Sequence, residues 1–541
     1  MKKYDKALLL SAAVVAAAVF GTVQHTDAAG RACDALTGLT LKDTTITTAE
    51  SVAAGAFTPP RVPNAQPIAV AFCRVAGTIK PSSDSDIKFE LWLPASGWTG
   101  RYESVGNGGF AGNIPYNAMI NPMLGGSAVA GTDDGHSTPG ASWALGHPEK
   151  IADYGYRAVH VTAETSKAIT AAFYGSAPKY SYFVGCSKGG GEALTEAQRF
   201  PKDFDGIIAA APANMFTDLF SSFAWEVFAN LNDKASYLSG DDVTKVGQAV
   251  VESCDAGDGV KDGLLTNPLK CNPDASKLPI TPAQMKTYQA LHDGMKSTGG
   301  KLIYPGKPYG SEAAGWRGMI TGPSFEEAQA RATQSTFGNG FLQNFVYNDA
   351  NWDPRKFDID KTPADAEKAV GQYLNATDVH FAEFKKHGKL IQWHGFSDPL
   401  VTPLGSVEYY NRVVAAQGKV GNGKKAVGTS GSLDNKALAK TQEFYRLFMA
   451  PGVGHCAGGP GPNQFGQTGG NGDAQHDIVV ALHQWVEKGV APTQIVATKY
   501  VGDDRTKGVA MTRPLCVYPQ VAKYKGTGDT NDAANFMCAA E

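Results

Sequence analysis

Short apolar runs alternate with amphipathic stretches in two blocks of the chain. The first block runs from Ile87 to Ala211 and the second from Lys389 to Val501. Apolar runs of strand length that alternate with amphipathic helical patterns are typical of a mainly parallel sheet covered by helices. The pattern therefore predicts an α/β fold whose core is contributed by both blocks.

The segment between the blocks has a different pattern. Residues 214–386 are rich in Gly, Pro, Asn and Asp and lack regular strand spacing, so we interpret them as an insertion between core residues 29–213 and 387–541. One aromatic set has the spacing of a single helix face: Phe216, Phe220 and Phe223. In a second set, Phe337, Phe341 and Phe345, the run Gly338-Asn339-Gly340 argues against a continuous helix. Such sets usually belong to the core; the alternative is an apolar face that receives an aromatic substrate.

The N-terminus has the pattern of a signal peptide. Basic residues at Lys2, Lys3 and Lys6 precede an apolar run from Ala7 to Phe20, which is shorter than the roughly 20 residues that a membrane-spanning helix needs. Small residues follow, and we expect cleavage near Ala28, so that residues 1–28 are removed. The mature protein is expected to be soluble and secreted or periplasmic, with no membrane partner.

Charge and cysteine content narrow the function classes. The 541-residue chain has a formal net charge of −3 and no long Lys/Arg run, which gives no electrostatic basis for binding nucleic acid. Eight cysteines in an exported chain indicate disulfides, although eight allow 105 connectivities. Proximity in sequence suggests three short-range bridges and leaves one long-range pair: Cys33–Cys73, Cys254–Cys271, Cys516–Cys538 and Cys186–Cys456.

A candidate nucleophile lies at a predicted turn between a strand and a helix. The run from Ser181 to Gly191 contains Gly185-Cys186-Ser187-Lys188-Gly189, which has the G-x-S-x-G form of a nucleophile elbow. Glycines are needed on both sides of the serine because strand and helix approach closely there. The alternative is a glycine-rich turn with an incidental serine, so Ser187 requires partners.

Partners for Ser187 are expected later in the chain, with the acid before the histidine. Asp398 follows the predicted strand 389–395, although an Asp before a Pro is also a common turn residue. His455 lies in a glycine-rich loop after the predicted strand 445–449, whereas His476 and His483 fit surface positions of an amphipathic segment. If Cys186 and Cys456 form a disulfide, their Cα atoms lie about 5 to 6 Å apart, which brings Ser187 and His455 within reach of each other.

Two further loops carry candidate chemistry. The glycine-rich run 106–112 follows a predicted strand, so the backbone N–H of Gly109, with that of Lys188, is our candidate oxyanion hole. The same run matches the dinucleotide fingerprint G-x-G-x-x-A, but the acidic residues Asp133 and Asp134 follow at a longer spacing than that motif uses. In the second loop, the carboxylates of Asp255, Asp258 and Asp262 suit a hard cation such as calcium; the alternative is an acidic solvated turn.

The motifs Gly185-Cys186-Ser187, Asp398 and His455-Cys456 resemble the catalytic serine, aspartate and histidine of the tannase and feruloyl esterase family. The acidic loop and the C-terminal run from Arg513 to Pro519 and on to Cys538 extend the resemblance over nearly all of the mature chain. In that family a disulfide joins the residues beside the serine and the histidine. The resemblance implies an α/β-hydrolase core with a large lid inserted between core strands. It also implies lid calcium bound by Asp255, Asp258, Asp262 and the carbonyls of Val260 and Leu264.

The resemblance implies aromatic carboxylic esters as substrates, among them hydroxycinnamate and gallate esters, which can be attached to plant polymers. One alternative is mono(2-hydroxyethyl) terephthalate, for which a lid arginine would bind the free carboxylate. Arg317, Arg331 and Arg355 are available in the inserted segment, but none lies in a local motif that matches that arginine. A second alternative, from another class, is a non-catalytic, calcium-stabilised ligand-binding protein on a hydrolase scaffold; a Rossmann-type reductase is a third.

Overall fold

The computed structural model describes residues 30–418, 433–467, 469 and 472–540. The expected signal peptide, residues 1–28, lies outside the described residues. No helix in the described part of the chain is long and apolar enough to span a membrane.

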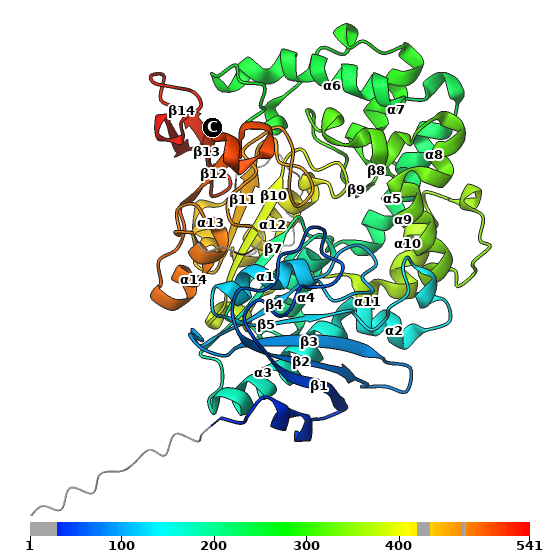
Figure 1. Ribbon diagram of the computed structural model, residues 1–541. Coiled ribbons are helices and arrows are strands. Elements are labelled where there is room, and N and C mark those ends of the chain that lie inside the picture. The colour runs from blue at the N-terminus through cyan, green and yellow to red at the C-terminus, as the bar shows by residue number, and fades with distance from the viewer. Residues whose placement is uncertain (1–29, 419–432, 468, 470–471, 541) are drawn as a thin grey trace, which may run out of the picture.

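A nine-stranded mixed sheet forms the centre of the molecule (Figure 1). Its order is β1-β2-β3-β5-β4-β6-β7-β10-β11; the first three strands are antiparallel to their neighbours, and the strands from β5 to β11 are parallel to one another. In chain order the strands are β1 (Thr44–Val52), β2 (Phe72–Ile79), β3 (Ile87–Pro94), β4 (Arg101–Val105), β5 (Ala128–Thr132), β6 (Tyr180–Cys186), β7 (Gly206–Ala210), β10 (Lys389–Gly395) and β11 (Tyr445–Ala450). The alternation of apolar strands and amphipathic helices predicted this α/β fold with a mainly parallel sheet.

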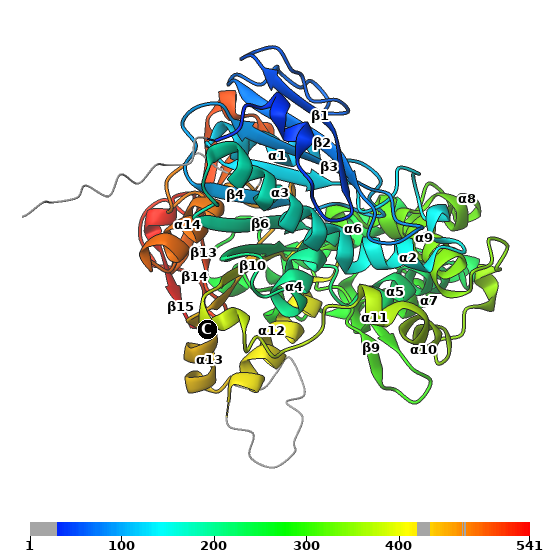
Figure 2. The same ribbon diagram turned by 90° about the horizontal axis from the view of Figure 1, so that it is seen from below.

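The side chains of the parallel strands pack into two hydrophobic layers, one on each face of the sheet, because successive side chains of a strand point to opposite faces. On β7, for example, Ile207 belongs to the core cluster on one face and Ile208 to the cluster on the other. The first face is covered by α3 (Ala158–Tyr174), α4 (Lys188–Arg199), α12 (Pro403–Gln417) and α13 (Asn435–Gln442), and the second by α1 (Tyr116–Leu124) and α14 (Ile478–Lys488). Figure 2 shows α3, α4 and α12 beside the sheet from below.

The segment between β7 and β10 is mainly helical and gathers on one side of the sheet (Figure 1). Its helices are α5 (Phe216–Leu231), α6 (Gly240–Cys254), α7 (Pro282–Asp293), α8 (Phe325–Arg331), α9 (Thr333–Phe341), α10 (Thr362–Ala366) and α11 (Gln372–Leu374). Two short antiparallel strands complete it: β8 (Met295–Lys296) and β9 (Leu302–Tyr304). A short helix of five residues, α2 (Pro148–Ala152), precedes α3 in the core.

The glycines between Phe337 and Phe341 do not interrupt a helix, so that expectation was wrong. α9 runs through them and continues as a π-helical turn over Leu342–Val346. A Cβ atom on Gly338 would lie 2.5 Å from the backbone nitrogen of Ala224 in α5, so the glycine is explained by the close approach of the two helices.

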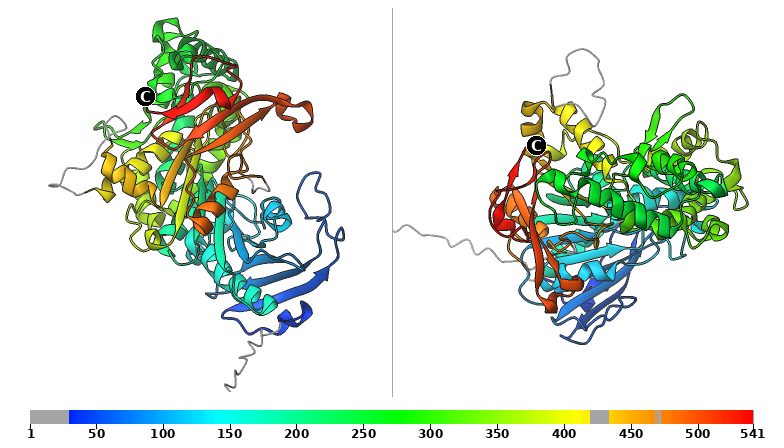
Figure 3. Two further views of the ribbon diagram at one scale, coloured as in Figure 1. Left: turned by 90° about the vertical axis from the view of Figure 1, so that its left-hand side faces the viewer. Right: turned by 90° about the horizontal axis from the view of Figure 1, so that it is seen from above.

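The last strands of the chain form separate small sheets. β12 (Gln494–Tyr500) lies in the second block, from which core strands were expected, but it pairs with β13 (Val509–Cys516) outside the nine-stranded sheet. β14 (Val521–Tyr524) pairs with β15 (Phe536–Ala539). Figure 3 shows this C-terminal segment (orange to red) beside the helices of the inserted segment (green). His476 and His483 were both expected at surface positions. His476 is exposed, but His483 is only 7% exposed, so the expectation was wrong for His483.

Four disulfides connect the chain, and their pairing is the one that proximity in sequence suggested. They are Cys33–Cys73, Cys186–Cys456, Cys254–Cys271 and Cys516–Cys538. Four disulfides are typical of proteins that fold in an oxidising compartment.

Candidate active site

Ser187 occupies a strained turn between β6 and α4. Its backbone angles are φ 63° and ψ −121°, an unusual conformation for a residue with a side chain. The flanking glycines are required sterically: a Cβ atom on Gly185 would lie 2.3 Å from the carbonyl oxygen of Gly189, and one on Gly189 would lie 3.0 Å from that of Asn107. The sequence between strand and helix therefore forms the sharp turn that the glycine spacing predicted.

Asp398 and His455 meet at the carboxyl ends of β10 and β11. His455 Nδ1 lies 2.7 Å from Asp398 Oδ2, and Asp398 is fully buried. The other oxygen, Oδ1, accepts hydrogen bonds from the backbone N–H groups of Leu400 (2.8 Å) and Val401 (3.0 Å). Asp398 is thus held in one orientation toward the histidine.

A second histidine, which the sequence analysis missed, also contacts this carboxylate. His394 Nε2 lies 3.1 Å from Asp398 Oδ2 and 3.0 Å from the carbonyl oxygen of Val401, so this nitrogen is the donor. Its Nδ1 then accepts the hydroxyl of Ser406 at 2.7 Å. His394 is the second-last residue of β10 and lies four positions before Asp398, a spacing that gives no signal without the fold.

The electrostatics keep Asp398 ionised. Burial alone would raise the pKa of its carboxyl, but the charge of His455 and the hydrogen bonds from His394 and His455 outweigh burial and hold that pKa well below its usual range. A buried carboxylate of this kind fixes a neighbouring imidazole with its proton on Nδ1 and leaves Nε2 free to accept a proton.

The Cys186–Cys456 disulfide brings the two halves of the site together. Cys186 precedes Ser187 and Cys456 follows His455, and the two cysteine Cα atoms are 5.9 Å apart. Residues that are 268 positions apart in sequence, Ser187 and His455, therefore lie on adjacent backbone.

Lys188 and Gly109 line the same cavity as Ser187. Gly109 has a positive φ of 55° and follows β4 in the glycine-rich loop. The next amide along α4, that of Gly189, is already bonded to the carbonyl oxygen of Asn107 at 2.8 Å. The amide of Lys188 is the one directly after the serine, as the elbow motif requires.

A buried ionic network, also missed from the sequence, lies behind this cavity. Lys188 is 5% exposed, and its Nζ donates to Glu192 Oε1 at 2.6 Å and lies 3.6 Å from Asp134 Oδ2. Burial lowers the pKa of Lys188, but Glu192 and Asp134 outweigh it and leave that pKa raised. Burial and the charge of Glu192 raise the pKa of Asp134 well above its usual range. The i, i+4 spacing of Lys188 and Glu192 was a usable signal.

The network also contacts the glycine-rich loop. Glu192 Oε2 accepts the backbone N–H of Asn107 at 3.0 Å. The hydroxyl of Tyr154 donates to the carbonyl oxygen of Gly109 at 2.7 Å, while Lys188 Nζ lies 4.3 Å from the centre of the Tyr154 ring. One set of buried groups thus links the residue after Ser187 to the loop that contains Gly109.

The cavity beside Ser187 is aromatic. Its lining from α5, α9 and the loop after β10 is Phe216, Leu219, Phe220, Phe223, Phe337, Leu400 and Val401. The rings of Phe216 and Phe220 stack at 4.0 Å between centroids, and Phe337 meets Phe220 edge-on at 5.9 Å. Both predicted aromatic sets therefore contribute side chains to this cavity. A larger cavity of about 300 Å³ lies between α1 and α14 and includes none of Ser187, Asp398 and His455.

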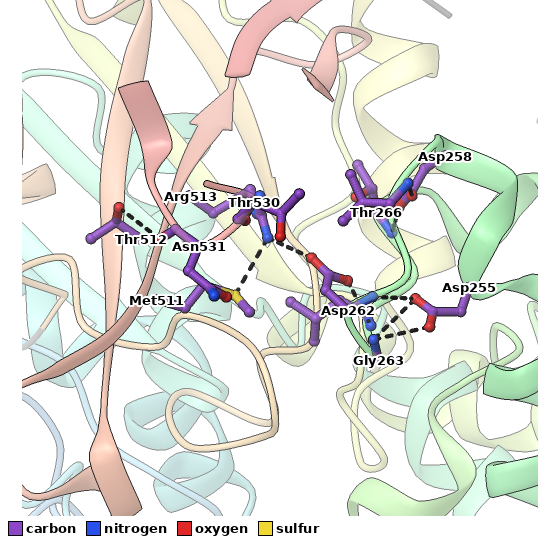
Figure 4. Close-up of polar contacts among 12 residues, drawn as sticks. Asp255, Asp258, Asp262, Gly263, Thr266, Met511, Thr512, Arg513, Thr530 and Asn531 are labelled. Carbon is purple, nitrogen blue, oxygen red and sulfur yellow. Dashed lines mark hydrogen bonds and ion pairs between the residues drawn. The ribbon is translucent and has the colours of Figure 1, made fainter. Parts of the chain in front are cut away.

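The acidic loop lies between α6 and the C-terminal strands (Figure 4). Asp255 accepts the backbone N–H groups of Asp262 and Gly263, and Asp258 accepts those of Val260 and Thr266. Asp262 pairs with Arg513 of β13 at 2.5 Å. Burial raises the pKa of Asp262, and Arg513 counteracts this rise. Val260 and Leu264, the predicted carbonyl ligands, are buried in the same loop.

The three arginines of the inserted segment lie away from the cavity. Each is exposed and paired with a nearby carboxylate: Arg317 with Asp241, Arg331 with Glu327 and Arg355 with Asp353. Of the described residues that line the cavity, none is an arginine.

Comparison with known proteins gives the family of this chain. The family described as tannase and feruloyl esterase matches residues 73–539. The chain belongs to this family. An uncharacterized esterase of Xanthomonas campestris pv. campestris is 40% identical to it over 557 residues, which cover 96% of this chain and 93% of that protein. A probable feruloyl esterase B-2 of Aspergillus flavus is 34% identical over 471 residues, which cover 83% of this chain and 84% of that protein.

A solved structure supports the fold. The crystal structure of feruloyl esterase B from Aspergillus oryzae has a TM-score of 0.82 and 28% identity, and covers 94% of this chain and 99% of that chain. This member of the tannase and feruloyl esterase family is therefore a carboxylic ester hydrolase with an α/β-hydrolase fold. The hypotheses of a non-catalytic binding protein and of a Rossmann-type reductase are set aside.

Proposed function

We propose that this esterase hydrolyses esters of small aromatic acids, of the feruloyl (hydroxycinnamoyl) or galloyl class, through an acyl-enzyme on Ser187. The observation that carries the proposal is the Cys186–Cys456 disulfide. It fixes the neighbours of Ser187 and His455 at a Cα–Cα distance of 5.9 Å, while His455 Nδ1 lies 2.7 Å from Asp398. A serine nucleophile needs a base within hydrogen-bond reach and a third group that orients the base.

In the first half of the reaction, Ser187 Oγ attacks the ester carbonyl carbon and His455 Nε2 takes the hydroxyl proton. Asp398 stabilises the imidazolium that forms. The oxyanion accepts hydrogen bonds from the backbone N–H groups of Lys188 and Gly109. When the carbon–oxygen bond to the alcohol breaks, the alcohol leaves with the proton from His455, and the acyl group stays on Ser187.

In the second half of the reaction, a water molecule is the nucleophile and the acyl-enzyme is hydrolysed. His455 takes a proton from the water molecule, whose oxygen attacks the acyl carbon, and a second oxyanion forms between Lys188 and Gly109. The bond to Ser187 Oγ then breaks, Ser187 recovers its proton from His455, and the aromatic acid is released.

The aromatic lining of the cavity favours a ring on the acyl side of the ester. Aromatic pairs gain stabilisation beyond the burial of their area, and Phe216, Phe220, Phe223 and Phe337 surround the position next to Ser187. The cavity volume is about 20 Å³, which is room for one water molecule. A phenolic ring can therefore enter only when side chains of α5 or α9 move aside, and Phe337, which is partly exposed, is the side chain we expect to move.

The names of the relatives support the feruloyl class, since the family members from Aspergillus flavus and Aspergillus oryzae are named as feruloyl esterases. Mono(2-hydroxyethyl) terephthalate is the second candidate. Its free carboxylate would need a cationic partner in the cavity, but the only cationic side chain in the lining described is Lys188, whose ammonium group is paired with Glu192.

We also propose that the acidic loop binds calcium as a structural ion. The donor set fits a hard cation: the carboxylates of Asp255, Asp258 and Asp262 and the carbonyls of Val260 and Leu264 are all oxygen ligands. Bound calcium would stabilise the loop between α6 and the C-terminal strands. Residues 1–28 are proposed to direct export, which agrees with the four disulfides, and the protein then acts outside the cytoplasm.

A small substrate panel tests the proposed function. Release of acid is measured from methyl ferulate, methyl gallate, mono(2-hydroxyethyl) terephthalate and p-nitrophenyl acetate, with Ser187→Ala as the control variant. We expect ferulate or gallate release that is lost in Ser187→Ala, and an organophosphonate label on Ser187 of the unmodified enzyme. Full ester turnover by Ser187→Ala would contradict the mechanism, and a preference for the terephthalate monoester would contradict the substrate class.

A further inference from the structure

A cluster of potential metal ligands lies outside the cavity of Ser187. Among the described residues, one group of three such side chains has its ligating atoms within 4.8 Å of one another: His160, Glu196 and Asp203. His160 is on α3, Glu196 is in the second half of α4, and Asp203 lies in the turn between α4 and β7. Glu196 is nine positions after Ser187, which corresponds to about 13 Å along the axis of α4.

Neighbouring groups hold two members of the cluster in place. His160 Nδ1 lies 2.6 Å from Asp203 Oδ2. The imidazole ring stacks on Phe200, with 3.8 Å between centroids and 6° between planes. Lys167 Nζ donates to the backbone carbonyl of Asp203 at 2.6 Å, which leaves the Asp203 carboxylate to His160.

Glu196 is the unexplained member. It is 1% exposed, and neither of its carboxylate oxygens has a hydrogen-bond partner in the described part of the chain. Burial, together with the charges of Asp203 and Glu192, raises the pKa of Glu196 well above its usual range; Lys167 counteracts this only in part. A buried carboxylate without a donor is costly, and either a proton or a bound cation relieves that cost.

The composition of the cluster distinguishes between kinds of cation. One imidazole nitrogen and two carboxylate oxygens suit a divalent transition ion such as Zn²⁺, which binds three protein ligands and water in a tetrahedral site. Calcium takes six to eight oxygen ligands, which this cluster does not supply. Two carboxylates would balance the charge of the ion, and the partly exposed edges of His160 and Asp203 leave a path for it from solvent.

We propose that His160, Glu196 and Asp203 form a binding site for one Zn²⁺-like ion. The ion replaces the proton between His160 and Asp203 and takes Glu196 as its third protein ligand. It joins α3 to α4 and to the turn before β7, and so braces the helix that begins directly after Ser187. The alternative for Glu196 is a proton shared with Asp203, without any metal.

The test uses the full-length protein, stripped of metal with a chelator and returned to calcium-containing buffer so that the acidic loop is saturated. Co²⁺ is titrated as a spectroscopic probe and binding is followed by its visible absorption and by calorimetry. We expect one equivalent of Co²⁺ to bind, Zn²⁺ to displace it, and Zn²⁺ to raise the Tm.

Two variants and a matched control locate the ion. Glu196→Gln and His160→Gln should lose the Co²⁺ absorption and at least tenfold in affinity, because each removes one of three ligands. Glu164→Gln should bind Co²⁺ like the unmodified protein, since exposed Glu164 lies 3.5 Å from the other ring nitrogen of His160 and is not in the cluster. Far-ultraviolet circular dichroism verifies that the variants are folded.

Two results would overturn the inference. The first is equal Co²⁺ binding by the unmodified protein and Glu196→Gln. The second is the absence of saturable binding to the unmodified protein, which would assign Glu196 to a shared proton. Neither result would contradict the esterase mechanism, because that mechanism is tested in a separate experiment, the comparison of ester hydrolysis by the unmodified protein and by Ser187→Ala.

Discussion

Removing the Cys186–Cys456 disulfide should reduce both stability and catalysis, and the double substitution Cys186→Ala/Cys456→Ala tests this. The bridge closes a loop with a sequence separation of 270 residues, whereas Cys516–Cys538 closes one of 22. Loop-closure entropy of the unfolded chain gives about 5.6 kcal/mol of stabilisation for the long loop and about 3.4 kcal/mol for the short one at 25 °C. We therefore expect Cys186→Ala/Cys456→Ala to lose about 2 kcal/mol more than Cys516→Ala/Cys538→Ala.

The catalytic effect distinguishes a positioning role from a purely stabilising one. Without the bridge, the backbone beside Ser187 and His455 is free to separate, and a displacement of about 1 Å between reacting groups costs about 100-fold in rate. Urea unfolding followed by circular dichroism gives the stabilities, and hydrolysis of methyl ferulate gives kcat/KM at a temperature at which both double variants are folded. We expect a loss of about 100-fold in kcat/KM for Cys186→Ala/Cys456→Ala only. Equal kcat/KM for the two double variants would refute the positioning role.

Three further predictions follow from the environment of single side chains. Glu192→Gln should cost about 3 kcal/mol of stability, because it removes the charged partner nearest to the buried ammonium group of Lys188. The variant should also have a lower kcat on both methyl ferulate and p-nitrophenyl acetate. An unchanged urea midpoint would contradict a stabilising role of the Lys188–Glu192 pair. Phe220→Ala should raise KM for methyl ferulate and leave that for p-nitrophenyl acetate nearly unchanged, whereas equal effects on both esters would exclude Phe220 from the aromatic subsite. Burial raises the pKa of Glu103 to about 7, so the folded protein binds more protons than the unfolded chain between pH 4.5 and 7, and stability falls as pH rises through this range. Urea unfolding at a series of pH values measures this decrease in stability, and Glu103→Gln should make it about 3 kcal/mol smaller. An unchanged decrease in the variant would show that other groups cause it.

The relation between the acidic loop and Arg513 bears on the proposed calcium site. Arg513 of β13 pairs with Asp262 and has its guanidinium over the ring of Phe536, so the C-terminal strands supply one positive charge to a loop with three carboxylates. Val260 of the loop packs with Cys516, Ala522 and Phe536 in one small hydrophobic cluster. A cation in this loop would therefore stabilise the contact between the inserted segment and the C-terminal strands as well as the loop itself.

The local features of this protein could be predicted from its sequence. The strand 389–395 and the turn at Ser187 were recognised because they depend on alternation and on glycines at fixed offsets, and both are local properties. The disulfide pairing was recognised because three bridges are short-range, so that the fourth followed by elimination.

Only the tertiary structure decided which groups surround these features. His394 joins Asp398, and Tyr154 joins the carbonyl of Gly109, through contacts between separate elements that no spacing in the chain encodes. Gly338 lies inside α9, where the close approach of α5 leaves no room for a side chain, whereas the sequence alone indicated a break in the helix at this glycine. Likewise β12 has the composition of a core strand but pairs with β13 outside the main sheet. The physical reason is common to all of these cases: periodicity fixes which face of an element is apolar, whereas its neighbours are fixed by the packing of the whole chain.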